Sequence, residues 1–417
     1  MDSAEREGLR PKGNVPNLRF PEFQGEWEKC TFDKIAQYKK GPFGSALKKD
    51  IFVPQSKDTI KVYEQQNAIK KNWTLSRYYI TKGYFNSHMK QFVAKAGDLI
   101  VSCAGTIGEI YELPQDAEEG VFNQALMRVQ VNDEAVNKEI FITVFSSMID
   151  KFSKIYSNGS AIKNIPPFAD LKKTQVFLPC KEEQKKIAKL LALLDERIAT
   201  QNKIIDKLQS LIKGLNDFLY TQYGGEVLTS FAELGTSYSG LSGKSAQDFG
   251  SGKPFITYLN VYSNNVIKEN DFQYVAIKDD EKQNVVKYGD VLFTLSSETP
   301  EEVGVGSVYL GKEKVYLNSF CFGIHITNTE VAFPPYLSYY VSLTAFRKFI
   351  YPYAQGSTRF NLCKADFEKA SIKLPTLADQ KRIYSILSHI DNKIITERQM
   401  LDLYNSQKQY LLRQMFI

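Results

Sequence analysis

Hydrophobic residues recur at alternating steps of four and three along residues 187–219, and the pattern returns near the end of the chain. The ten positions of the first copy are Ile187, Leu191, Leu194, Ile198, Gln201, Ile205, Leu208, Ile212, Leu215 and Leu219. Adding 196 to each number gives Ile383, Leu387, Ile390, Ile394, Glu397, Leu401, Tyr404, Lys408, Leu411 and Met415. On a helix such positions form one narrow stripe, which is usually buried against another helix. We call these twenty positions the seam, and they predict two long helices.

The two copies also share polar residues and prolines at the same offset. The identical pairs are Pro179/Pro375, Gln184/Gln380, Lys185/Lys381, Asp195/Asp391 and Thr200/Thr396. The chain is therefore interpreted as a duplication. Three polar residues interrupt the seam, and two explanations stay open for Gln201, Glu397 and Lys408: partial exposure at a loose seam, or polar contacts that set register and antiparallel pairing.

The residues before each helix predict a globular part of short strands and helices. In the first part we expect an extended entry strand over 15–21, short strands within 60–95, a strand from Gly97 to Ser102, a helix over about 138–152 and a strand over 171–179. The second part repeats this plan. The predicted boundaries are a flexible tail (1–15), a first domain (16–178), a first helix (179–222), a second domain (223–374) and a second helix (375–417).

The expected fold class is α+β. A helix of about 40 residues is roughly 60 Å long, and the other copy is the nearest partner for its seam. We therefore expect an antiparallel coiled coil, two mixed α/β domains and an internal pseudo-two-fold axis. Two related modules suit a ligand with two separated sites. DNA is such a ligand, since one groove faces a protein about every 34 Å.

Composition excludes several other classes of protein. No hydrophobic run approaches the ~20 residues of a membrane span, and the first 15 residues lack the apolar core of a signal peptide. The five cysteines are far apart and the three histidines stand alone. We therefore expect no structural zinc, no other metal and no disulfide framework, as in a reducing cytoplasm. The net charge of +6 permits nucleic acid as a partner without establishing it.

Motifs for catalysis are weak or absent. Ile165-Pro166-Pro167-Phe168 and Phe333-Pro334-Pro335-Tyr336 resemble the motif of amino-methyltransferases, but Ile and Phe replace the Asn or Asp that would accept the hydrogen bond from the target amino group. The glycine cluster at 303–307 lacks the strand–turn–helix setting of a nucleotide fold and is interpreted as a strand-edge turn. Glu301 and Glu302 are interpreted as part of a solvated loop. No cofactor is expected, and a binding protein is favoured over an enzyme.

Several motifs together resemble the specificity subunit of type I restriction–modification systems. They are the stretch Asn17-Leu18-Arg19-Phe20-Pro21-Glu22-Phe23 with Trp27, the Gly-Asp-Leu/Val strand starts, the Gly-Ser turns, and the Leu-Pro-x4-Gln-Lys-x-Ile helix openings at Leu178 and Leu374. The resemblance implies two target-recognition domains that read the halves of a bipartite double-stranded DNA target. It also implies helices that set the unread spacer and bind methyltransferase subunits, two in number, which recruit restriction subunits. It implies no catalytic site.

Direct readout of DNA needs donors and acceptors on loops, with Lys and Arg on the phosphates. The candidates in the first domain are Lys39, Lys40, Ser45, Lys48, Lys49, Ser102, Thr106, Ser160 and Lys163. Those in the second domain are Ser242, Lys244, Ser245, Ser296, Ser297, Ser357, Thr358 and Arg359. Asn123 and Asn318 fit a turn as well as they fit base readout.

Two alternatives to a DNA-reading subunit remain at this point. One is a DNA methyltransferase or nuclease in its own right, which S-adenosylmethionine binding by the isolated chain would favour. The other is a coiled-coil scaffold whose domains bind proteins. In that case, helices without the domains would retain every partner.

Overall fold

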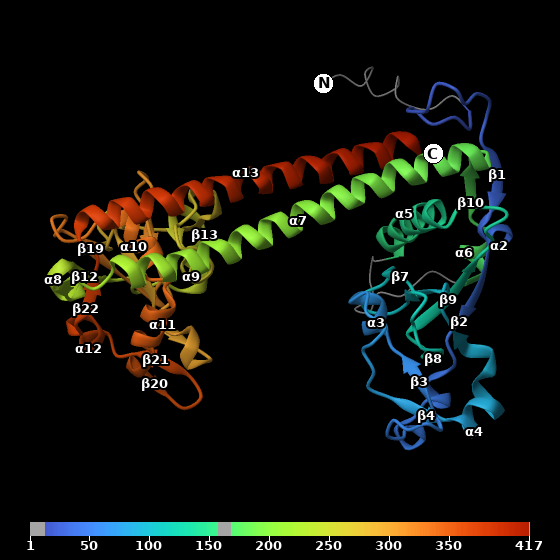
Figure 1. Ribbon diagram of the computed structural model, residues 1–417, viewed down its shortest axis with the longest axis horizontal. Helices are drawn as coiled ribbons and strands as arrows, with labels where there is room; N and C mark the ends of the chain where they lie inside the picture. The colour runs from blue at the N-terminus through green and yellow to red at the C-terminus, as the bar shows by residue number, and fades with distance from the viewer. Residues whose placement is uncertain (1–12, 157–167, 417) are drawn as a thin grey trace. The chain divides into compact units, whose positions relative to one another are not determined.

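The computed structural model of the protein describes residues 13–156 and 168–416 (Figure 1). The chain divides into two compact units. Unit 1 consists of Met1–Ala199 and Asp402–Ile417, and unit 2 consists of Thr200–Leu401. Each unit thus contains one globular part and a segment of both long helices. The predicted boundaries at 178/179, 222/223 and 374/375 instead separate the globular parts from the long helices. These boundaries stay a prediction.

The globular part of unit 1 alternates short strands with short helices. Its strands are β1 (Glu28–Thr31), β2 (Ala36–Lys40), β3 (Thr59–Tyr63), β4 (Tyr79–Thr81), β5 (Val93–Ala94), β6 (Leu99–Ser102), β7 (Ile110–Glu112), β8 (Gly120–Phe122), β9 (Leu126–Val131) and β10 (Gln175–Leu178). Its helices and single turns are α2 (Phe32–Ile35), η1 (Gly44–Ala46), η2 (Lys49–Ile51), α3 (Gln65–Ile69), α4 (Lys82–Tyr84), η3 (Phe85–Met89), η4 (Lys90–Phe92), α5 (Lys138–Tyr156) and α6 (Phe168–Lys173).

The strands of unit 1 form a four-stranded antiparallel sheet in the order β2-β9-β6-β7, a second sheet in the order β4-β3-β8-β5, and the pair β1-β10. In the second sheet β3 and β8 run parallel. The main core packs Phe141 and Phe145 of α5 against Phe32 and against the apolar residues of β2, β6 and β9. This aromatic layer holds α5 on the four-stranded sheet.

Unit 2 contains the strands β11 (Val227–Thr229), β12 (Gly235–Ser239), β13 (Phe249–Ile256), β14 (Gln273–Val275), β15 (Val291–Thr294), β16 (Ser296–Ser297), β17 (Gly306–Val308), β18 (Tyr316–Leu317), β19 (Cys321–Ile326), β20 (Ala354–Gly356), β21 (Phe360–Leu362) and β22 (Ile372–Leu374). Its helices and turns are α8 (Phe231–Leu234), η5 (Ala246–Asp248), α9 (Tyr258–Ser263), η6 (Glu269–Asp271), η7 (Pro300–Glu302), α10 (Pro334–Tyr340), α11 (Thr344–Ile350), η8 (Tyr351–Tyr353) and α12 (Lys364–Lys369).

The two units share one topology. The sheet β12-β19-β15-β17 of unit 2 has the same order as β2-β9-β6-β7 of unit 1, and the pair β11-β22 corresponds to β1-β10. The sheet β14-β13-β18 of unit 2 corresponds to β4-β3-β8 of unit 1, because in each the middle strand pairs antiparallel with one neighbour and parallel with the other. Unit 2 also contains a small sheet, β16-β21-β20. The part of unit 1 that would correspond to this small sheet includes residues 157–167, outside the described residues. The predicted duplication is therefore confirmed at the level of strand order.

The Gly-Asp motif at the start of β6 and β15 has a structural cause. The carboxylate of Asp98 accepts hydrogen bonds from the Lys95 N–H at 3.0 Å and from the Gln130 side chain at 2.8 Å. In unit 2 the Asp290 carboxylate accepts from the Lys287 N–H at 2.8 Å and from the Tyr238 hydroxyl at 2.7 Å. Burial raises the pKa of Asp290. The motif thus closes a tight turn before the central strand.

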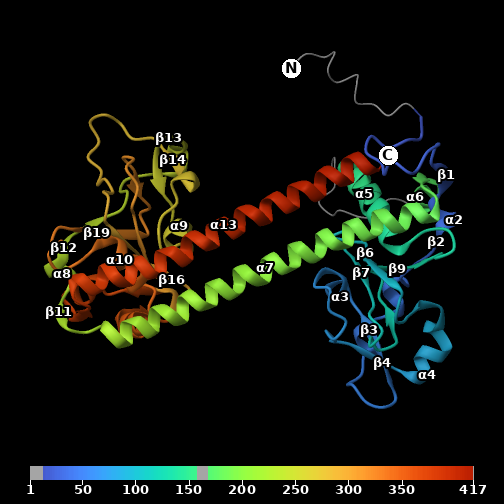
Figure 2. The same cartoon turned by 45° about the horizontal axis from the view of Figure 1, so that its top comes forward.

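The two long helices pair in antiparallel fashion within each unit (Figures 1 and 2). They are α7 (Lys181–Tyr223) and α13 (Leu377–Met415). In unit 1, Ile187 shares a core with Met415, and in unit 2 Leu219 shares a core with Ile383. Residue numbers therefore rise along α7 as they fall along α13. Every seam position is buried or half-buried, as the heptad pattern predicts.

The polar residues of the seam are bonded across it. Gln201 is 6% exposed, and its amide donates to the Glu397 backbone carbonyl at 3.0 Å and also to the Glu397 carboxylate. Lys408 forms an ion pair with Asp195. Since 397 is 201 plus 196, the first contact joins equivalent positions of the two copies. If a local two-fold axis relates the two antiparallel helices, equivalent positions must meet where the axis passes between them. The contact therefore favours the explanation that the polar seam residues set register and pairing, rather than the explanation that the seam is loose.

Two sequence predictions about strands were wrong. Residues 15–21 form bends and a turn rather than an extended strand, because Arg19 binds both the Glu183 carboxylate and the Gly25 carbonyl and so folds the segment back. The strand predicted over 171–179 begins only at Gln175, since Leu171 belongs to α6. The helix predicted over about 138–152 is present as α5, and Gly225, with a φ of +93°, follows the end of α7.

Candidate nucleic-acid interface

In unit 2 several polar loops meet around a turn formed by residues 318–320, which we call the Asn318 turn. The loop after β12 is attached to it by the Leu241 N–H, which donates to the Leu317 carbonyl at 2.7 Å. The segment after β15 is attached by the Leu295 N–H, which donates to the Phe320 carbonyl at 2.8 Å. Asn318 itself accepts the Phe320 N–H at 2.9 Å, and Asn123 accepts the Ala125 N–H at 3.0 Å in unit 1. These contacts support the turn explanation for both asparagines.

A glycine allows the loop after β12 to lie this close. A Cβ atom on Gly240 would stand 2.0 Å from the Asn318 carbonyl oxygen, and a Cβ on Gly41 would stand 2.0 Å from that of Asn123. No side chain fits at either distance. Both units therefore hold the loop after their first sheet strand against the corresponding asparagine turn.

Gly240→Ala is expected to lower the free energy of unfolding by about 1–3 kcal/mol, because the new methyl group overlaps backbone that cannot move away. Recognition by unit 2 should weaken with it, since the loop after β12 is displaced. Thermal unfolding and DNA binding measure the two effects. Gly214→Ala is the matched control, because a Cβ at Gly214 meets no atom within 4 Å; equal losses in the two variants would contradict the explanation.

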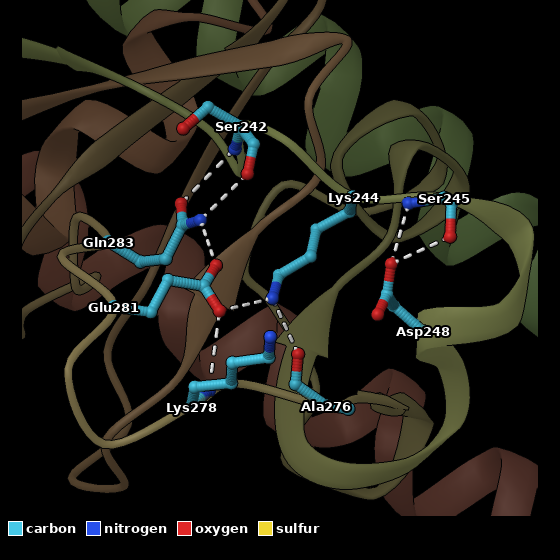
Figure 3. Close-up of polar contacts among 8 residues, drawn as sticks. All are labelled: Ser242, Lys244, Ser245, Asp248, Ala276, Lys278, Glu281 and Gln283. Carbon is cyan, nitrogen blue, oxygen red and sulfur yellow. Dashed lines mark hydrogen bonds and ion pairs between the residues drawn. The ribbon is translucent and has the colours of Figure 1, made fainter.

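Lys244, on the loop after β12, is held by the segment between β14 and β15 (Figure 3). Its ammonium group lies 2.5 Å from the Glu281 carboxylate and donates to the Ala276 carbonyl at 2.6 Å, and its side chain is 8% exposed. Gln283 donates to the same carboxylate at 2.5 Å and to the Ser242 carbonyl at 2.8 Å. These hydrogen bonds, first that of Lys244 and then that of Gln283, hold the pKa of Glu281 below its usual value. Lys244 thus shapes the loop, and its charge is already compensated.

The other candidates in unit 2 fall into two groups. Ser296 and Ser297 are buried; the Ser297 hydroxyl donates to Glu302 at 2.7 Å, and Tyr258 donates to the Ser296 carbonyl at 2.9 Å. The remaining residues are exposed, and they lie on the loop after β12 or between β20 and β21: Ser242, Ser245, Ser357, Thr358 and Arg359. Ser245 also donates to Asp248 at 2.8 Å (Figure 3).

In unit 1 the exposed candidates are Lys40, Ser45, Lys48, Lys49 and Thr106. Lys39 is half-buried, and its ammonium donates to Gln91 at 2.8 Å. Ser102 is completely buried, and its hydroxyl accepts the Glu109 N–H at 2.9 Å. Ser160 and Lys163 lie outside the described residues. Lys48 and Lys49 lie in the connection after β2, just as Ser242 and Ser245 of unit 2 lie in the connection after β12.

The motifs considered for catalysis have structural functions where they can be seen. Pro334 and Pro335 open α10, and the next residue of this helix, Tyr336, is fully buried. The first Pro-Pro motif begins in residues outside the described part. Gly304 and Gly306 precede and begin β17, an edge strand, as the strand-edge interpretation expects. Glu302 is half-buried and bonded to Ser297 and Tyr262, so it is not simply solvated.

Within residues 13–156 and 168–416, no group of three or more His, Cys, Asp and Glu side chains could hold a metal ion. Over the same residues, none of the helices has the length and apolar composition that a membrane crossing needs.

Two residues at the interface escaped the sequence analysis. Phe320 is 52% exposed at the end of the Asn318 turn. An aromatic residue in a polar turn was the available signal. No local sequence pattern indicates Glu281, the partner of Lys244, because the two residues are 37 positions apart in the sequence.

Comparison with known proteins agrees with this architecture. The family described as type I restriction modification DNA specificity domain matches residues 24–210 and 235–403. A putative type I restriction enzyme MjaX specificity subunit from Methanocaldococcus jannaschii is 25% identical, over 88% of this chain and 92% of the relative. The MjaVIII specificity subunit of the same organism is 22% identical, over 91% and 89%.

A solved chain from a study of complex assembly and conformational transition of the type I R-M system shares the fold. Its TM-score is 0.59 at 15% identity, and the match covers 93% of this chain and 96% of that one. The likeness shows a common fold of mixed helix and sheet with long helices. The chain belongs to the type I restriction–modification DNA specificity family, whose function is recognition of the DNA target rather than catalysis.

Proposed function

We propose that each unit reads one half of a bipartite DNA sequence. The observation that carries this proposal is the repetition of one sheet order, in which a polar loop after the first strand is held against an asparagine turn in both units. The loops differ in sequence while their anchoring is the same. Different loops on a common frame are suited to two different half-sites.

We further propose that the chain directs adenine methylation or restriction by partner subunits. Two methyltransferase subunits would bind it, and restriction subunits would join through them. The long helices supply the surface for the methyltransferase subunits, and the exposed loop lysines of unit 1 supply phosphate contacts. Membership of a DNA-specificity family does not favour the two alternatives, a methyltransferase in its own right and a protein scaffold.

The decisive experiment is to map methylated adenines in DNA from cells that carry this chain with its methyltransferase partner. A bipartite motif is expected. Exchange of residues 223–374 for those of another family member should change one half of the motif and leave the other half and the spacer unchanged. A complex without preference among DNA sequences would contradict the proposal.

The outward face of α7 in unit 2 is a candidate surface for a methyltransferase subunit. Ile204, Leu211 and Phe218 follow at steps of seven, so they share one face, and they are 38%, 52% and 61% exposed. A hydrophobic stripe on a helix is a typical protein-binding surface.

Leu211→Asp is therefore expected to weaken binding of the methyltransferase subunit at least about tenfold, since a charge would be buried in the contact. Sedimentation of the mixed subunits measures this, and Gln209→Asp, also on an exposed position of α7, is the control. Unchanged assembly of the Leu211 variant would exclude this face as the contact.

A further inference from the structure

An exposed aromatic ring and an exposed arginine lie together on unit 2. Phe320 is at the end of the Asn318 turn, between β18 and β19, and Arg359 is in the short connection between β20 and β21. The guanidinium carbon of Arg359 lies 5.5 Å from the centre of the Phe320 ring. A cation over the face of an aromatic ring is attracted to it, by about 0.5–1 kcal/mol at exposed sites.

Both side chains are carried by one rigid frame. The Leu295 N–H donates to the Phe320 carbonyl, and the Leu295 carbonyl accepts the Leu362 N–H, each at 2.8 Å. β16, which follows Leu295, pairs with β21. Gly356 has a φ of +147°, and a Cβ there would stand 2.0 Å from the Arg359 carbonyl oxygen. The hairpin therefore needs glycine at this position to place Arg359 beside Phe320.

The donors of Arg359 remain available. Among the described residues it forms no hydrogen bond and no ion pair, and it is exposed. Arg347, in the same unit, differs: it is half-buried, and it donates to the carbonyls of Gly304, Glu301 and Val303. Arg347 is a structural residue. The guanidinium of Arg359, by contrast, is planar and has free N–H groups, and it lies beside Phe320 where the loops of unit 2 meet.

We propose that Arg359, oriented by Phe320, reads a guanine in the half-site that unit 2 recognises. This rests on the proposed function. Guanine presents two acceptors, N7 and O6, in the major groove, and the planar guanidinium donates to both at once. Phe320 acts as a positioning residue, since it holds the guanidinium plane and reduces the side-chain entropy that binding would cost.

The first unit lacks this device at the corresponding position. Ala125 follows Asn123 by two residues, as Phe320 follows Asn318. An alanine offers no ring for a cation. The pair of Arg359 and Phe320 is therefore assigned to the half-site of unit 2, so its effect is expected at one half of the DNA target and not at the other.

The test uses the chain in complex with its methyltransferase subunits and a library of DNA targets. With the wild-type chain, the half-site that changes when residues 223–374 are exchanged should contain a required guanine. Arg359→Gln is expected to lose about 5- to 150-fold in preference for that guanine and to shift toward adenine, which offers the acceptor and donor that Gln matches. Preferences at the other positions should stay unchanged.

Phe320→Leu should lower discrimination at the same position while leaving binding to DNA without the target sequence unchanged, and Phe320→Tyr should retain it. Both side chains are exposed, so thermal unfolding should change little. If Arg359→Gln weakens binding to all sequences equally and flattens the salt dependence, Arg359 contacts phosphate and the inference is wrong. A motif without guanine in that half-site would also overturn it. A wild-type complex without any sequence preference would instead contradict the proposed function.

Discussion

Insertion of one heptad into each long helix is expected to lengthen the unread spacer of the DNA target by about three base pairs and to leave both half-sites unchanged. Seven helical residues add roughly 10 Å, and successive base pairs are about 3.4 Å apart. A copy of 202–208 would follow Gln201, and a copy of 390–396 would precede Glu397, so that the new segments face each other and the Gln201–Glu397 contact is kept. The spacer is read from the map of methylated adenines.

The matched control replaces residues 202–208 with an equally long heptad of the same hydrophobic pattern. This control changes the sequence of the helix but not its length, so the spacer in the DNA target should not change. An insertion of four residues in each helix is a second comparison. It breaks the heptad register and should impair assembly rather than produce a new spacer. A changed half-site with an unchanged spacer would show that the functions of loops and helices have been assigned the wrong way round.

Arg19→Met is expected to lower the free energy of unfolding of unit 1 by about 3–5 kcal/mol, because it leaves a buried carboxylate without a partner. Arg19 donates to both oxygens of Glu183, at 2.8 and 2.7 Å, and the Glu183 side chain is fully buried at the start of α7. The hydrogen bond that Arg19 donates to the Glu183 carboxylate raises the pKa of Arg19. Hydrogen exchange of α7 and thermal unfolding of the whole chain measure the loss.

Two variants separate the buried charge from general damage to the segment. Lys186 pairs with Glu22 nearby, but their side chains are 54% and 45% exposed. Lys186→Met should therefore cost no more than about 1 kcal/mol. The double variant Arg19→Met with Glu183→Met should recover much of the loss, since it leaves no unpaired charge. Equal stability of the Arg19 and Lys186 variants would mean that the buried pair does not anchor the segment.

The long helices and the duplication were predictable, whereas the state of each candidate side chain was not. A heptad pattern is a local property, and α7 and α13 follow it closely. The accessibility of a serine depends on residues distant in the chain. Ser297 looked like a loop residue, but β21 pairs with it and Glu302 accepts its hydroxyl. Ser102 was likewise a candidate for DNA readout, but it is the last residue of β6 and is completely buried.

For the N-terminal motif, too, one property was predictable from the sequence and another was not. The stretch around Arg19 was correctly singled out by its resemblance to a family, but its extended conformation was predicted from local composition. Its conformation depends instead on Glu183, which is 164 residues away. An ion pair across that separation leaves no periodic signal, so the bends of residues 15–21 were missed.

The amino-acid sequence alone determined that this protein is a duplicated chain of two α/β parts and two long helices, without an evident catalytic motif. It could do so because heptads, repeats and turn residues are recognised from the order of residues along the chain. The tertiary structure decided which polar groups are free. Lys244 is neutralised by Glu281 and Ser102 is buried, while Arg359 lies over Phe320 with its donors unpaired. The physical reason is that burial and charge compensation depend on neighbours in space, and those neighbours come from distant parts of the chain.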